Sequence, residues 1–240
     1  MKSLALIAVA IVSLFTITSY AQSRGGAMVV QPDYVFIPPG FDSNDNAEIV
    51  LAGQLPSTCY TAAASRYALD RSRKIIKVYN MVRYTPDENC LQMMVDYAQT
   101  IRIGSLPAGN WQVIIQGRGE SFDAGALPIV PARNPAIDDQ MYLPVKIVTE
   151  LPGNPGEQRY IQLAGRIDTS CVRARDVKIL SRRPGVIEVL PLATNLKRIC
   201  EGRFQKFSTR VNIGTVSRKT LVHVRALNGL ARNIVVDPNQ

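Results

Sequence analysis

The sequence predicts an all-β protein made of two tandem β-sandwich domains, each holding one disulfide. Three observations lead to this prediction: the chain contains an internal duplication, short alternating apolar runs are separated by turn residues, and cysteines occupy matching places in the two copies. Of the 240 residues, 46% are hydrophobic and 20% are charged. This composition supplies enough apolar material for one or two cores and excludes a mainly disordered chain.

The N-terminus has the features of a secretion signal. Lys2 gives a basic start, an apolar run extends from Leu4 to Phe15, and Ser19 and Ala21 place small residues where signal peptidase cleaves. The run is shorter than the roughly 20 apolar residues of a membrane span. We therefore expect cleavage before Gln22 and an exported protein, secreted or periplasmic, with no transmembrane segment. Because no cysteine follows the cleavage site, lipid attachment is not expected.

The mature chain repeats itself once. Residues 49–59 match residues 161–171 with a shift of 112, and both segments contain Leu-Ala-Gly followed by a cysteine six residues after the glycine. Residues 100–105 match residues 210–215 with a shift of 110. Two tandem copies of one domain follow from these matches.

We place the boundary between the copies in the polar stretch 131–135, which contains two prolines and interrupts the apolar pattern. The expected organisation is a signal peptide, residues 1–21, a first β-sandwich domain, residues 22–134, and a second β-sandwich domain, residues 135–240. Each domain has about a hundred residues, the usual size of a β-sandwich.

Each copy shows the period-two alternation of half-buried β-strands. The alternating runs are Ile101 to Ile103, Trp111 to Ile115, Val211 to Ile213 and Val222 to Ala226. Residues 75–79 and 186–190 are rich in β-branched side chains and are further strand candidates. Turn residues such as glycine, proline and asparagine recur about every ten positions. Only the alanine-rich residues 61–71 permit one or two turns of helix as an alternative.

The four cysteines fit the duplication, because each copy carries one pair at equivalent places. Of the three possible pairings, only Cys59 with Cys90 and Cys171 with Cys200 respects the repeat. Neither pair has the two-residue spacing of a catalytic dithiol, and disulfides persist in exported proteins. We predict two structural disulfides, each stabilising its domain by roughly 3 to 4 kcal/mol in the chain-entropy model.

These strand, turn and cysteine patterns, together with the segment Gly-Ser-Leu-Pro-Ala-Gly-Asn-Trp-Gln-Val at residues 104–113, resemble bacterial secreted proteins built of tandem immunoglobulin-like β-sandwich domains. The resemblance covers nearly all of the mature chain and is one of class. It implies the fold and no ligand site. The cysteine spacing departs from antibody domains, in which the two cysteines lie roughly twice as far apart with a tryptophan between them.

The residues do not form a recognisable catalytic constellation, so no catalytic residue is predicted. A serine or cysteine nucleophile needs a base, and the only histidine, His223, alternates with Val222 and Val224, which predicts an outward-facing strand residue. The acidic pairs Asp87–Glu88 and Asp138–Asp139 are adjacent in sequence and do not predict two carboxylates facing each other across a cleft.

No metal or cofactor is predicted either. Residues 42–46 space their oxygen ligands like the start of a calcium loop, but Ala47 replaces the expected glycine and the distal glutamate is absent. A solvated turn is therefore the preferred interpretation of this segment. Trp111 heads an alternating run and is expected in a core rather than as a sugar platform.

The charge lies in the second copy. Residues 22–134 hold 10 lysines and arginines against 10 acids, whereas residues 135–240 hold 17 against 9 and are therefore net +8. The candidate residues for binding an anion or a partner are Arg173, Arg175, Arg182, Arg183, Lys197, Arg198, Arg203 and Lys206. In an exported protein such a surface attracts an acidic protein partner or an anionic envelope polymer; a solvated basic surface without a ligand is the alternative.

Nucleic acid is not an expected partner, because only Phe204 and Phe207 are interleaved with these cations. We expect a non-enzymatic binding or scaffold protein of the bacterial periplasm or cell surface. One alternative is an inhibitor or accessory subunit of a secreted enzyme, presenting loops such as residues 151–156. The other is a hydrolase with an unrecognised carboxylate site.

Overall fold

The computed structural model describes residues 26–239 apart from 87–88, 197–199, 201 and 203. The expected signal peptide and its cleavage site lie outside these described residues. Within them every regular element is a β-strand, and none forms a helix long and apolar enough to cross a membrane.

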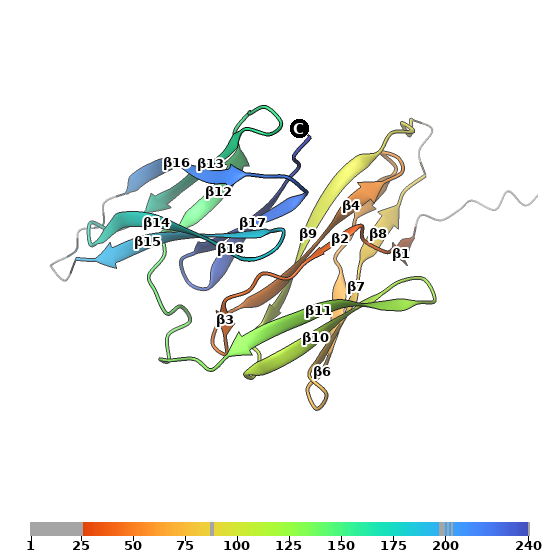
Figure 1. Cartoon of the computed structure of the whole chain (residues 1–240), viewed down its shortest axis with the longest axis horizontal. Coiled ribbons are helices and arrows are strands. Elements are labelled where there is room, and N and C mark those ends of the chain that lie inside the picture. The colour runs from red at the N-terminus through yellow and green to blue at the C-terminus, as the bar shows by residue number, and fades with distance from the viewer. Residues whose placement is uncertain (1–25, 87–88, 197–199, 201, 203, 240) are drawn as a thin grey trace, which may run out of the picture.

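Two groups of strands lie side by side (Figure 1). We call residues 26–130 the N-terminal half and residues 142–239 the C-terminal half. The strands of the N-terminal half are β1 (Ala27–Val29), β2 (Tyr34–Phe36), β3 (Phe41–Asp42), β4 (Ala47–Leu55), β5 (Tyr60–Ala62), β6 (Arg66–Asp70), β7 (Ile75–Tyr79), β8 (Met81–Tyr84), β9 (Val95–Gly104), β10 (Gly109–Gln116) and β11 (Ser121–Val130). They form the sheets β2-β4-β9, β3-β11-β10-β7-β6 and β1-β8-β5.

The C-terminal half has two sheets, β12-β13-β16 and β14-β15-β17-β18. Its strands are β12 (Val145–Glu150), β13 (Gln158–Ile167), β14 (Val172–Arg183), β15 (Val186–Asn195), β16 (Gln205–Thr215), β17 (Thr220–Ala226) and β18 (Leu230–Val236). The segment between the halves, residues 131–141, contains no strand.

The strand pairing follows the same pattern in the two halves. β4 pairs antiparallel with β9 as β13 does with β16, and β7 pairs parallel with β10 as β15 does with β17. Each second sheet then continues antiparallel, from β10 to β11 and from β17 to β18. The N-terminal half differs by adding the small sheet β1-β8-β5 and by pairing β3 parallel with β11 at the edge of its second sheet.

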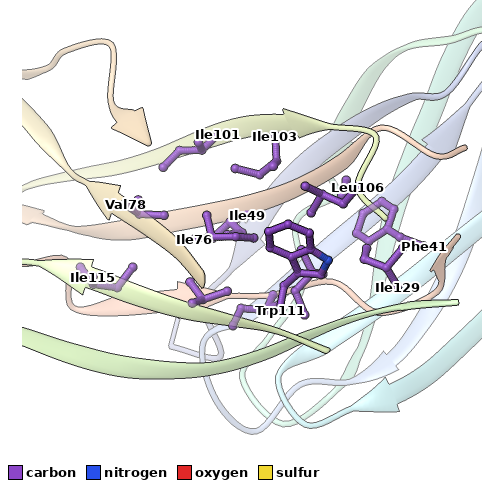
Figure 2. Close-up of a cluster of buried hydrophobic side chains, with 14 of the residues drawn as sticks. Phe41, Ile49, Ile76, Val78, Ile101, Ile103, Leu106, Trp111, Ile115 and Ile129 are labelled. Atoms are coloured by element: carbon purple, nitrogen blue, oxygen red, sulfur yellow. The ribbon is translucent and has the colours of Figure 1, made fainter. Parts of the chain in front are cut away.

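Each half has its own hydrophobic core between its two larger sheets. The N-terminal core is built around Trp111, which is fully buried as predicted (Figure 2). Its Nε1 donates a hydrogen bond to the carbonyl of Pro107 at 2.9 Å, so the ring is buried without an unsatisfied donor. The C-terminal core consists mainly of valine and isoleucine side chains, which suit the pleated surface of a sheet.

Disulfide bonds join Cys59 to Cys90 and Cys171 to Cys200, which is the predicted pairing. The two bonds close segments of similar length, with sequence separations of 31 and 29 residues. Because disulfides form and persist in oxidising surroundings, they indicate an extracellular or other oxidising compartment.

The strand predictions hold at residues 75–79, which form β7, and at residues 186–190, which lie within β15. The helical alternative at residues 61–71 is wrong, because this stretch contains the end of β5 and all of β6. β6 pairs along its whole length with β7, with Tyr67 opposite Val78. This pairing outweighs the helix propensity of the alanines.

Candidate functional site

The outer side of β4 forms a shared apolar cluster with the C-terminal half. This interface cluster consists of Phe36, Val50, Ala52, Val186 and Leu221. Every residue of β17, and every residue of β4 except Gln54, is buried. A strand with both faces buried lies between two packed layers, so each half covers the outer face of a sheet in the other.

His223 lies in this interface and is completely buried. Its Nδ1 is 3.2 Å from Glu48 Oε1 and 2.9 Å from Asn233 Oδ1. Because both neighbours are acceptors, Nδ1 carries the proton and donates, while Nε2 has no hydrogen-bond partner. The sequence correctly predicts that His223 points away from the core formed by Val222 and Val224. It does not predict the burial, because that face is covered by a distant part of the chain.

Glu48 is the acidic partner of this histidine and comes from the N-terminal half. Burial raises the pKa of its carboxyl, but the hydrogen bond from and electrostatic interaction with His223, together with the hydrogen bond from Asn233, lower it by more, so the pKa lies below its ordinary value. The amide of Asn233 donates to Glu48 Oε1 and to Thr100 Oγ1. Glu48, His223 and Asn233 therefore bind the two halves through polar groups at the edge of the interface cluster.

A second buried charge pair crosses the interface at Arg225. Its Nη2 donates to the carbonyl of Gly40 at 2.7 Å and to Asp45 Oδ2 at 3.1 Å. The guanidinium also lies 4.4 Å from the centroid of the Phe41 ring. Arg225 is 4% exposed and Asp45 is 6% exposed, so each charge is compensated by the other rather than by water.

Hydrogen bonds within the turn at residues 42–46 orient the carboxylate of Asp45, which Arg225 contacts. Asp42 Oδ1 accepts hydrogen bonds from the backbone amides of Asn44 and Asp45, and Asp45 Oδ2 accepts one from the amide of Asp42. The solvated turn expected here is instead a largely buried turn, since both aspartates are buried. The carboxylate of Asp45 is paired with an arginine 180 residues further along the chain.

Arg182 and Arg183, two of the eight candidate cations, both have partners within the molecule, and those of Arg183 lie across the interface. Arg182 donates from Nε and Nη2 to both oxygens of the buried Glu188, at 2.7 and 2.9 Å. Arg183 donates from Nη1 to the carbonyls of Ile37 and Ala126 in the N-terminal half. Burial lowers the pKa of the Arg183 guanidinium. Both guanidinium groups therefore have hydrogen-bond partners within the molecule, and the side chain of Arg182 is 50% exposed.

A large open cleft of about 1220 Å³ runs along one side of the interface, between Tyr34 and Pro184. Lys219 lines it and lies 3.5 Å from Asp96 in one half and 3.1 Å from Asp237 in the other. Partial burial lowers the pKa of Lys219, but the two carboxylates outweigh this effect and raise it.

The remaining candidate cations are divided between the other surfaces of the C-terminal half. Arg173 and Arg175 are exposed on β14, and Lys206 is exposed on β16. Lys197, Arg198 and Arg203 lie outside the described residues. The structure therefore does not bring the eight residues together into one described site.

Lys206 belongs to a different cluster, which we call the basic face. Register places Lys206 opposite Arg166 and places Arg210 opposite Gln162, so the three cations share the outer surface of β13 and β16. Arg166 lies 4.4 Å from the Phe204 ring centroid, and Arg210 lies 3.9 Å from that of Tyr160. Asp168 is the one acidic partner of these three cations in the described part of the chain, 2.7 Å from Arg166.

A shallow hollow of about 470 Å³ adjoins the basic face, between Lys146 and Lys206. Ile147, which lines it, is 60% exposed, and Phe204, which contacts the lining residue Arg166, is 70% exposed; both values are high for large apolar side chains. Cations, aromatic rings and exposed apolar groups thus occur together on the outer side of the sheet β12-β13-β16.

The acidic residues of the interface are not predicted from the sequence. Asp45 lies just before the apolar run of β4 and Glu48 lies within it. A charge next to a continuous apolar strand is the sequence pattern that could have indicated a buried ion pair. Likewise, Arg166 and Arg210 become neighbours of Lys206 only once the register is known.

The groups considered for catalysis have other surroundings. His223 is buried in the interface and does not reach solvent. Asp138 accepts a hydrogen bond from the Gly229 amide at 2.8 Å, and burial raises the pKa of its carboxyl. Asp139 accepts a hydrogen bond from Asn134, and the pair Asp87–Glu88 lies outside the described residues. Among described residues no three His, Cys, Asp or Glu side chains cluster as metal ligands would.

Comparison with known families assigns a β-sandwich to part of the chain. Residues 49–124 match the ORF11 beta-sandwich domain. The match extends from β4 into β11, covering about a third of the chain, all of it in the N-terminal half. Comparison with curated proteins and with solved structures finds no match. The match supports the fold and assigns no ligand.

Proposed function

We propose that this is an exported, non-enzymatic binding protein whose basic face takes an anionic partner. The observation that carries the proposal is the basic face itself, in which Arg166, Lys206 and Arg210 lie on one exposed surface, with Asp168 as the acidic partner among the described residues. Three cations on one surface attract anions more strongly than the same charges scattered over the molecule.

The proposal also includes two tandem immunoglobulin-like domains, 22–134 and 135–240, following a cleaved signal peptide. The duplicated segments, the common strand pairing and one cysteine pair in each half support this organisation. The interface then has a clear role, because buried pairs such as Arg225–Asp45 hold the two domains in one orientation and leave the basic face pointing outward.

In this proposal the cations of the second domain have different roles. Arg183 and Arg225 bind the first domain, and Arg182 pairs with Glu188 inside its own domain. Arg166, Lys206 and Arg210 bind the partner. An acidic protein or an anionic envelope polymer fits this surface, and its binding weakens with salt because the charges are exposed.

Chromatography on phosphocellulose, an anionic polymer, tests the proposal. We expect the triple variant R166E/K206E/R210E to elute at clearly lower salt than the wild type. The matched control R66E/K77E/R83E removes the same charge from exposed positions of the N-terminal half and should elute close to the wild type. Equal losses of retention in the two variants would show that only net charge matters and would overturn the proposal.

A further inference from the structure

β16 is a long strand with a free edge. It has 11 residues and pairs only with β13 among the described strands. From Gln205 to Asn212 this pairing is continuous, and the only register shift lies beyond it, at the end of the strand. Along the opposite edge of β16, the backbone N–H and C=O groups form an uninterrupted row with no strand partner among the described residues.

The other long edge strand of this half, β14, is less suited to pairing. Two register shifts interrupt it, between Ala174 and Val177 and between Leu180 and Arg183. Bulges bend and twist a strand, which prevents a second chain from pairing along it. β9 holds the place in the N-terminal half that β16 holds here, and it contacts β5, β6 and β18. Among the described strands of this half, β16 thus combines length and regularity with an edge that no other strand pairs with.

The side chains of β16 determine which residues would suit a strand from another protein that pairs with its free edge. Lys206 and Arg210 point to the outer face, as the register with β13 shows, and both are exposed. Phe207 and Val211 alternate with them and point toward the sandwich interior. A strand added beside β16 places its own side chains close to these residues on each face. Acidic residues would face the two cations, and apolar residues would face Phe207.

We propose that β16 is a docking edge that adds an extended segment of an acidic partner protein, with acidic and apolar residues in alternation, to the sheet β12-β13-β16. This inference rests on the proposed function, because the same basic face supplies the charge attraction. Backbone hydrogen bonds supply affinity in such strand addition, and the alternating side chains supply specificity. The competing explanation is that the cations only protect a free edge from aggregation.

The test compares two synthetic capped peptides with equal charge. The first is Glu-Val-Glu-Val-Glu-Val-Glu; the second replaces each valine with proline, which keeps the charge and extended shape but removes backbone donors. With the full-length mature protein, we expect the valine peptide to bind about tenfold more tightly, because its extra backbone hydrogen bonds are available. It should also slow amide hydrogen exchange in residues 205–212 and not in β14.

Two variants locate the site. K206E/R210E should lose peptide binding, whereas R173E/R175E, which makes the same charge change on β14, should keep it. Equal affinity for the two peptides without protection of β16 would overturn strand addition and leave the basic face as a simple anion site. Absence of peptide binding by a protein that still requires Arg166, Lys206 and Arg210 on phosphocellulose would also overturn this inference alone. If retention on phosphocellulose did not depend on these three cations, the proposed function itself would be overturned.

Discussion

The sheets β2-β4-β9 and β12-β13-β16 have the same strand pairing, but the outer face of the first is buried and that of the second is exposed. On β4 the outward residues Glu48, Val50 and Ala52 are buried against the C-terminal half. With the shift of 112, Tyr160, Gln162 and Ala164 stand in their places on β13. Arg210 lies opposite Gln162 on the neighbouring strand, as Thr100 lies opposite Val50. The same strand pairing therefore supports an interface where small apolar side chains surround Glu48, and an exposed surface where the outer face carries polar and basic side chains.

The largest effect is expected where the interface depends on a buried charge. Arg225→Ala leaves Asp45 buried without its partner, and we expect a loss of about 3 to 5 kcal/mol in the free energy of unfolding, measured with urea. Arg210→Ala on the exposed face is the matched control and should change stability by less than about 0.5 kcal/mol. Similar losses in the two variants would contradict the division between interface and exposed face.

The disulfides test whether the two halves are equally stabilised. Because the sequence separations of 31 and 29 residues are nearly equal, C59S/C90S and C171S/C200S should each cost about 2 to 4 kcal/mol. Thermal unfolding of the two double variants measures this, with thiol titration of the untreated wild type as the control. A free thiol in the wild type, or a large difference between the variants, would break the symmetry of the comparison.

An exchange of side chains between the two faces tests the comparison most directly. Val50→Gln places an amide in the interface cluster and should destabilise the protein by about 2 kcal/mol, because an apolar side chain is lost and a polar one is buried. Gln162→Val at the matching exposed place should have an effect within about 0.5 kcal/mol. Urea unfolding of the two variants gives both numbers, and a reversed order would show that the faces are not assigned correctly.

The smallest expected effect concerns pH. Because the folded-state pKa of Glu48 is lowered, its ionised form contributes stability at pH values above its ordinary pKa of 4.5, and this contribution is lost as pH falls through the folded pKa. The stability of the wild type should therefore decline more steeply than that of Glu48→Gln between about pH 5 and pH 3. The exposed Glu120→Gln is the control and should keep the steep decline; parallel curves for wild type and Glu48→Gln would argue against this role of Glu48.

Particular residues show how far sequence reasoning reaches. The period-two pattern locates β7 and the buried Trp111, because alternation depends on neighbours along one strand. The same logic fails at residues 61–71, where pairing with β7 decides the conformation, and at His223, where the covering surface comes from β4. Arg182 and Arg183 belong to a basic run in sequence, yet their partners are Glu188 and carbonyls as far away as Ile37.

The sequence by itself determines the β class, the cysteine pairing and the concentration of positive charge in the C-terminal half, because composition, period and spacing are local properties of the chain. Only the tertiary structure decides which cations bind partners within the molecule and which lie on the exposed basic face. That division depends on contacts such as Asp45 with Arg225 across 180 residues, and on the register that joins Arg166 to Lys206. Neither the docking of two sheets nor the pairing of distant strands leaves a periodic trace in a single sequence.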